Sequence, residues 1–282
     1  LNGIYISWDE EADRAALVDN DDTYRELYNV IGKVANPVLL NVDAASGDRI
    51  MANRLKAEAL VLRGWFHYLL VNIYAKAYDP ATAATDPGIV YALETDEMDV
   101  PNEKLTVGKV YEMILADVDS ALNLGSLPVS PDDMRVGLPF AYAVKAKVLM
   151  SMRDYDGAFE AAGECLALKN TIDDYHNLLQ PATTYGDGQI EFIRPYLTLE
   201  EEMFESPDYL MLQIFTQDLW DAFEEGHLVK DSLLTDIRIY GTPQQAYSLC
   251  GLNVPCGYAM NTYYSPLGLT TVDMYLTQAE CY

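Results

Sequence analysis

Cysteine and histidine are scarce in this sequence. Its 282 residues include four cysteines and three histidines. No two cysteines form a CxxC pair, which excludes a zinc ribbon and a thioredoxin-type redox motif. The histidines are too scattered for an HExxH motif or another metal-ligand spacing, and no P-loop or GxGxxG stretch occurs. The sequence therefore predicts no tightly bound metal and no cofactor.

Basic residues are also few. The chain has 18 lysines and arginines against 44 aspartates and glutamates, so its formal charge is −26. Binding to a phosphate backbone needs basic patches, so this balance excludes nucleic acid as a partner. It also predicts repulsion from anionic lipid surfaces. Solubility alone would explain the same acidity, so the charge does not by itself identify a partner.

Long apolar runs are absent as well. The most apolar stretch is RLKAEALVLRGWFHYLLVNIYAKAYDP, residues 54–80, which Arg63, His67 and Asn72 interrupt. A membrane span needs roughly 20 consecutive apolar residues, so this stretch does not qualify. On a helical wheel its polar residues lie on two opposite sides, with apolar residues on both flanks between them. This pattern predicts an inner helix packed between neighbours and ending near Asp79-Pro80.

Apolar stripes and capping residues predict the other helices. We expect a helix at about 23–35, with Thr23 and Glu26 as a capping box and the acidic run DNDD favouring its N-terminus. Another helix follows Thr106, its expected cap. Two more occupy 139–168, with a short turn at Arg153-Asp154 between them. The side chains predicted to be buried are Leu62, Trp65, Leu69, Ile114, Val118, Leu149 and Phe159.

Small residues occur where antiparallel helices would have to approach closely. Ala57, Ala59 and Gly64 fall in the long helix, and Ala161 and Ala162 fall in the last helix of the 139–168 pair. Such spacing is typical of the helix-turn-helix unit of a tetratricopeptide repeat, whose period is about 34 residues. A generic helical hairpin is the alternative for either unit alone.

Composition divides the chain into three parts within one integrated domain. Residues 1–170 carry the helix pairs, and 171–270 are rich in Gly, Pro, Asn, Thr and Tyr, which predicts a loop-rich subdomain. Residues 271–282 begin a further repeat helix. That helix stops at Tyr282 without a cap or a breaker, so we expect the sequence to be part of a longer chain.

Several stretches resemble the SusD/RagB family. KAEALVLRGWFHYLLVNIY is similar to its signature helix, G-E-A-x-x-L-R-A-x-x-Y: Glu58, Ala59, Leu62 and Arg63 match, whereas two small-residue positions differ. LTVGKVYEMILADVDSALNL, RVGLPFAYAVKAKVLMSMRDYDGAFEAAGECL, QIEFI, TDIR and TTVDMYLTQAECY resemble later family elements in the same order. The resemblance spans nearly the whole chain. The lipid-bearing N-terminal cysteine of the family is not in this sequence, and 190–270 is short.

This resemblance implies a fold and a function. The fold is mostly α, a tetratricopeptide-like scaffold with an irregular loop-rich subdomain. Family members are surface-exposed outer-membrane lipoproteins of Bacteroidetes, which capture nutrients, usually glycans, and partner a SusC-like TonB-dependent transporter. The implied roles are therefore glycan binding without catalysis, and contact with the membrane only through a lipid anchor that this sequence lacks. Arg63 and Glu58 are expected to be structural, because a charge in a packed helix must be paired.

Exposed aromatic residues flanked by polar groups suit the C–H faces and hydroxyls of sugars. In the family such groups come from the segment before the signature helix and from loops after the second repeat pair. The candidates here are Trp8, Tyr24, Asn29, Tyr196, Asp208 and Tyr209. Trp8 is the best of them, because ISWDEE has no apolar stripe. Packing against the first repeat is the alternative for Trp8, and packing in the core for each tyrosine.

Two other functions stay open at this point. A glycoside hydrolase would need two carboxylates across a cleft, and the candidate acids are Glu94, Asp96 and Glu97, Glu200 to Glu202, and Glu224 and Glu225. A repeat scaffold that binds only protein is the other alternative. Maturation in the periplasm would also allow a disulfide between Cys250 and Cys256, because GLNVP between them favours a turn.

Overall fold

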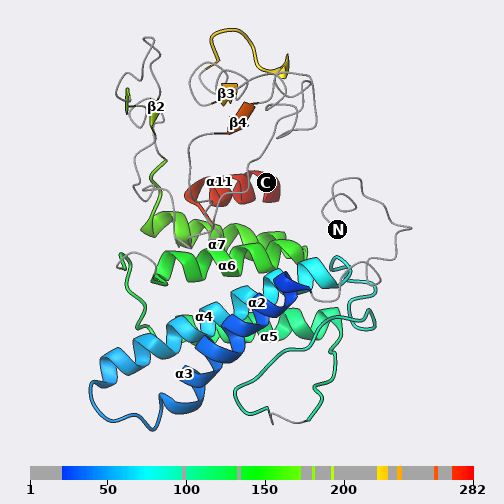
Figure 1. Cartoon of the computed structure of the whole chain (residues 1–282), viewed down its shortest axis with the longest axis vertical. Coiled ribbons are helices and arrows are strands. Elements are labelled where there is room, and N and C mark those ends of the chain that lie inside the picture. The colour runs from blue at the N-terminus through cyan, green and yellow to red at the C-terminus, as the bar shows by residue number, and fades with distance from the viewer. Residues whose placement is uncertain are drawn as a thin grey trace, which may run out of the picture. The chain divides into compact units, whose positions relative to one another are not determined.

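The computed structural model describes residues 21–96, 100–131, 135–172, 180–181, 192–193, 221–227, 234–236, 257–259 and 269–282. The described chain is mostly helical, which confirms the predicted fold class (Figure 1). It divides into two compact units. One holds the described residues of 21–131 and 136–168 together with Met274–Tyr282, and the other holds those of 169–273.

The helices belong to the first unit, except for the first three residues of α11, and short strands occur in the second. The helical elements are α2 (Asp22–Val30), the π-helix η2 (Ile31–Ala35), α3 (Asn36–Asn41), α4 (Arg49–Tyr74), α5 (Val107–Asn123), α6 (Leu138–Ser151), α7 (Tyr155–Leu168) and α11 (Thr271–Cys281). In the second unit β1 (Gln180–Pro181) pairs antiparallel with β2 (Phe192–Ile193), and β3 (Leu234–Asp236) pairs antiparallel with β4 (Gly257–Ala259). No helix in the described part of the chain is both long and apolar enough to cross a membrane.

The caps of α2 and α5 test the predicted helix starts. Thr106 caps α5 as expected, with its hydroxyl accepting from the amide of Lys109 at 3.3 Å. The capping box at the first helix is wrong, because Asp21 is the cap and accepts from the amide of Tyr24 at 3.0 Å. Thr23 therefore lies inside the first turn, and the acidic run supplies the cap itself.

The long helix α4 is the centre of the first unit. It ends at Tyr74, five residues before the predicted end, because Ala75 takes an extended conformation. Gly64 allows α4 to pack closely on α5: a Cβ there would lie 3.3 Å from Val118 Cγ2 and 3.4 Å from the carbonyl oxygen of Ile114. The predicted role of small residues in close helix packing is confirmed at this position.

Helices α6 and α7 form the second antiparallel pair, with α5 packed against α6 (Figure 1). Arg153, in the turn between them, has φ +62°, and the carboxylate of Asp154 accepts from the amide of Gly157 at 3.1 Å at the start of α7. The turn predicted at these two residues is therefore present. The C-terminal helix α11 continues the array, since Gln278 donates to the carbonyl of Phe159.

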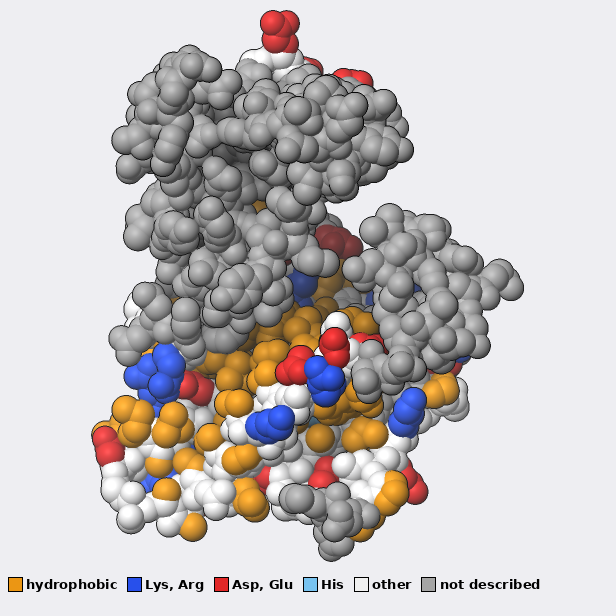
Figure 2. Space-filling view, in the orientation of Figure 1, with side chains coloured by type: hydrophobic (Ala, Val, Ile, Leu, Met, Phe, Trp, Pro, Cys, Tyr) orange, Lys and Arg blue, Asp and Glu red, His pale blue; other side chains and the backbone are white. Residues whose placement is uncertain are grey.

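Most of the predicted core is buried. Trp65, Ile114, Val118 and Leu149 are buried, whereas Leu62 and Leu69 are half-buried. Phe159 is 41% exposed, so its predicted burial is wrong. The small side chains next to it on α7 face the core instead, and Phe159 lies about 100° around the helix from Ala158. On the face shown in Figure 2, charged side chains of both signs lie among broader areas of apolar side chains.

Candidate functional site

Three tyrosines gather where α2 meets the end of α4. Tyr24 and Tyr28, one turn apart on α2, have ring centroids 4.7 Å apart, and the ring of Tyr74 meets that of Tyr24 edge-on at 5.0 Å. We call Tyr24, Tyr28 and Tyr74 the tyrosine cluster. Tyr24 is half-buried, so part of its ring is open to solvent. The cluster includes one of the aromatic residues that the sequence suggested for ligand binding.

Hydrogen bonds fix the rings of the tyrosine cluster. Tyr74 donates its hydroxyl proton to Asp21 Oδ2 at 2.9 Å, so this carboxylate both caps α2 and holds a ring. Tyr28 donates to the carbonyl of Val90 at 2.7 Å. Burial raises the pKa of Tyr28 well above the ordinary range, which keeps its hydroxyl protonated as a donor. The fold therefore fixes the positions of the Tyr28 and Tyr74 rings, against which the ring of Tyr24 packs.

The other candidate residues have different positions. Asn29 is half-buried and donates its side-chain amide to Glu26 at 3.3 Å. It follows Tyr24 by five residues, which places it about 140° away around α2 and not beside the tyrosine cluster. Asp21 is the polar group next to the cluster, and sequence reasoning assigned it no ligand role. The remaining candidates lie outside the described residues: Trp8, Tyr196, Asp208 and Tyr209.

A buried ion-pair network lies at the middle of α4. Arg63 is 5% exposed and donates to both carboxylate oxygens of Asp117, at 2.6 and 2.7 Å. Arg63 also donates to Glu94, and Tyr91 donates its hydroxyl proton to Asp117 at 2.6 Å. Burial disfavours the charge of Arg63, but the hydrogen bonds and charge of Asp117 outweigh it and raise the pKa of the guanidinium.

This network assigns structural roles to several charged residues. Arg63 is paired inside the helical unit, and Glu58 pairs with Arg54 at 2.9 Å along α4. Glu94 is engaged by Arg63, and Asp96 accepts from the amide of Leu93 at 2.7 Å. These two acids therefore support structure. The other catalytic candidates are exposed, as for Glu224 and Glu225, or lie outside the described residues, as for Glu97 and Glu200 to Glu202.

His67 is neutral and fully engaged. Its Nδ1 lies 2.8 Å from the carbonyl oxygen of Arg63, and its Nε2 lies 3.0 Å from the amide nitrogen of Ala92. A carbonyl only accepts and an amide only donates, so Nδ1 carries the proton and Nε2 accepts. Burial lowers the pKa of His67 to about 3. Within the described residues no group of His, Cys, Asp or Glu side chains could hold a metal ion.

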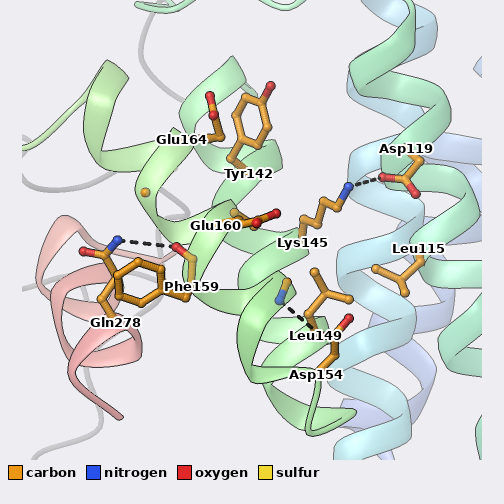
Figure 3. Close-up of a pocket in the computed structure, with 13 residues that line it drawn as sticks. Leu115, Asp119, Tyr142, Lys145, Leu149, Asp154, Phe159, Glu160, Glu164 and Gln278 are labelled. Atoms are coloured by element: carbon orange, nitrogen blue, oxygen red, sulfur yellow. Dashed lines mark hydrogen bonds and ion pairs between the residues drawn. The ribbon is translucent and has the colours of Figure 1, made fainter. Parts of the chain in front are cut away.

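An open groove lies across α5, α6 and α7, with a volume of about 740 Å³ (Figure 3). Tyr142, Lys145 and Leu149 line it from α6, at positions i, i+3 and i+7 of one helix face. Lys145 forms an ion pair with Asp119 of α5 at 2.8 Å. The sequence does not predict this groove, because its walls come from separate helices. The spacing of Glu160 and Glu164 on α7 was the one signal available in the sequence.

The helical pairs define a tetratricopeptide-like fold, and the comparisons identify its family. A family model described as "Starch-binding associating with outer membrane", SusD-like, matches residues 2–150. The chain belongs to this SusD-like family, as the resemblance implied. No curated protein matches the sequence.

Solved structures support the same fold. A SusD superfamily protein from Bacteroides thetaiotaomicron aligns with a TM-score of 0.66 at 18% identity, covering 92% of this chain and 61% of that one. A laminarin-binding SusD-like protein aligns with a TM-score of 0.63 at 16% identity, covering 93% and 66%. Surface glycan-binding protein A from Bacteroides thetaiotaomicron, in complex with laminarihexaose, gives 0.61 at 11% identity, covering 92% and 64%. The chain thus spans less than two thirds of each of these structures.

Proposed function

We propose that this protein binds a glycan at the cell surface, as an outer-membrane lipoprotein, and delivers it without catalysis to a SusC-like TonB-dependent transporter. The observation that carries the proposal is the family match over residues 2–150, a range that includes α2 to α5 and nearly all of α6. Two similar structures are described by their binding of laminarin or laminarihexaose. A glucan is therefore the first ligand class to test.

The tyrosine cluster supports the proposal from chemistry. A sugar ring presents a flat C–H face that packs on an aromatic ring, and its hydroxyls need polar partners at the edge. Tyr24 offers a partly open ring, and Asp21 lies beside it with carboxylate oxygens that can accept further hydrogen bonds. We propose Tyr24 and Trp8 as stacking residues, and Asn29, Tyr196, Asp208 and Tyr209 as further ligand contacts.

The absence of catalysis is supported by the engagement of candidate acids. Hydrolysis of a glycosidic bond needs one carboxylic acid and one carboxylate free to face the substrate. Glu94 and Asp96 are instead occupied by Arg63 and by the amide of Leu93. A steady release of reducing ends from laminarin, abolished by substituting one acid, would contradict this part of the proposal.

The test is binding of laminarin and of soluble starch, measured by isothermal titration calorimetry and by retardation in polysaccharide-containing native gels. Wild type is compared with Tyr24→Ala and Trp8→Ala. Tyr155→Ala is the matched control, because Tyr155 is 45% exposed on α7, away from the cluster. Loss of one stacking contact of about 0.5–1.5 kcal/mol should raise Kd about two- to tenfold.

Thermal unfolding of each variant separates loss of binding from loss of folding. Equal binding by wild type, Tyr24→Ala and Trp8→Ala would contradict the placement of the site. Failure of wild type to bind any member of a panel of plant, algal and animal polysaccharides would overturn the glycan function itself. A gene for a TonB-dependent transporter beside this one is the expected genetic context, and its absence would count against the proposed delivery step.

A further inference from the structure

The groove across α5, α6 and α7 carries negative charge that the protein does not neutralise. Glu160 and Glu164 line it from one face of α7, four residues apart (Figure 3). Among the described residues neither carboxylate has a hydrogen bond or an ion pair. The cation nearest in the lining, Lys145, already pairs with Asp119 at 2.8 Å.

These two acids do not serve the stability of α7. Like charges at positions i and i+4 repel each other along a helix. The positions three and four residues from either glutamate hold only Asp, Glu, Gly, Ala and Leu, so no neighbour on α7 offsets the charge. The last turn of α7 contains no basic residue either. A positively charged group from outside the chain would relieve this repulsion.

The rest of the groove suits the apolar part of a basic side chain. Tyr142 lies beside Glu164, so a cation held by the carboxylates would also meet an aromatic ring (Figure 3). Leu115 and Leu149 supply apolar surface on which the methylene groups of lysine or arginine can pack. The volume of about 740 Å³ leaves room for more than one such side chain.

We propose that this groove binds an extended segment of a partner protein that carries arginine or lysine next to an apolar residue. Helical-repeat arrays commonly bind extended segments along surfaces built from successive helices. The net charge of −26 would also steer a cationic segment toward the protein. A neutral glycan would leave both carboxylates unneutralised, which is why the charge favours a peptide. The proposal is independent of the glycan-binding function.

The test uses fluorescent octapeptide libraries with one central position fixed as Arg, Lys, Gln or Glu and the other positions randomised. Binding to the intact chain is followed by fluorescence anisotropy at about 0.05 and 0.2 M salt. The Arg and Lys libraries should bind at least about tenfold more tightly than the Gln library, and the Glu library should bind most weakly. Equal binding of the Arg, Gln and Glu libraries would overturn the proposal.

Matched double variants separate a built site from general attraction to an acidic protein. Glu160→Gln with Glu164→Gln removes two charges from the groove, and Glu103→Gln with Glu112→Gln removes two exposed charges outside its lining. Both change the formal charge from −26 to −24 (−26 + 2). The groove variant should weaken binding of the Arg library about tenfold, and the control should change it less than twofold.

Two further outcomes would also decide the question. Equal weakening by both double variants would show non-specific attraction and overturn the proposal. Loss of laminarin binding in the groove variant, with no preference for Arg or Lys libraries, would assign the groove to glycan instead. Unchanged laminarin binding in the groove variant, with loss of peptide binding, is the result expected if the two sites are separate.

Discussion

Replacing Asp117 with asparagine tests the buried network of α4 most directly. The substitution keeps the size of the side chain but removes the charge that faces Arg63, at 2.6 and 2.7 Å. Breaking a buried ion pair by removing one partner costs about 3–5 kcal/mol, because the other charge stays desolvated. Glu94 still contacts Arg63 in the variant, so we expect the lower end, about 3 kcal/mol.

Urea unfolding, followed by the helical signal in circular dichroism, measures this loss of stability, because the described helices belong mainly to the unit that contains Arg63. Asp119→Asn is the control: Asp119 lies two residues further along α5, and its carboxylate is 47% exposed in the pair with Lys145. An exposed pair contributes about 0–1 kcal/mol, so the control should fall within that range. A loss below about 1 kcal/mol for Asp117→Asn would refute the structural role of the network.

A double variant separates the value of the pair from the penalty of an orphaned charge. Arg63→Met combined with Asp117→Leu removes both charges and keeps similar volumes. Since apolar replacement of a buried pair is often neutral, this variant should recover much of the stability lost in Asp117→Asn. The double variant leaves the hydroxyl of Tyr91 without its acceptor on residue 117 and Glu94 without its partner Arg63, so recovery should be incomplete. A double variant less stable than Asp117→Asn would contradict the argument.

Three further changes test single features of the helical unit. Gly64→Val should destabilise by about 1–3 kcal/mol, because its Cβ alone would lie 3.3 Å from Val118; a thermal melt equal to wild type would contradict close packing of α4 on α5. His67 has its pKa lowered to about 3 from 6.5, so between these values the unfolded state binds a proton that the folded state excludes. The free energy of unfolding should therefore fall as pH falls from about 6.5 toward 3. Urea titrations at pH 7, 5 and 4 measure this fall, and the free energy of unfolding of His67→Gln should depend less steeply on pH than that of wild type. Phe159→Ser should lower the free energy of unfolding by less than about 1 kcal/mol, because the ring is 41% exposed. A larger decrease in the same titration would show that the ring contributes to the core.

Features set by neighbouring residues could be predicted from the sequence. Thr106 caps α5 because its hydroxyl accepts from an amide three residues ahead. Gly64 is one of the small residues of α4, and it lies where α4 contacts α5. The start of α2 shows the limit of such local rules. Thr23 and Asp21 are both good caps two residues apart, and the hydrogen bond from Tyr74, 53 residues away, adds to the role of Asp21.

Features set by distant residues could not be predicted. The position of Arg63 in a packed helix predicts that its charge is paired. It does not predict that Asp117 and Glu94 are the partners, since they lie 54 and 31 residues further along the chain. Phe159 was placed in the core because it is large and apolar. Alanines on α7 fill that interface instead, because a small side chain permits close contact with α6. The groove could not be predicted for the same reason, since it forms only when three helices pack together.

Polar residues of α2, α3 and α4 connect the signature helix to the candidate site. Tyr28, Asn36, His67 and Arg63 each bond to a different part of the segment 90–94. That segment contains no helix or strand, so Tyr28, Asn36 and His67 satisfy its backbone groups, while Arg63 pairs with the side chain of Glu94. Tyr28 is also a member of the tyrosine cluster and packs edge-on against His67 at 6.1 Å. Arg63 of the signature helix therefore bonds to the same segment whose carbonyl at Val90 accepts from Tyr28, and the ring of Tyr28 contacts the ring of Tyr24.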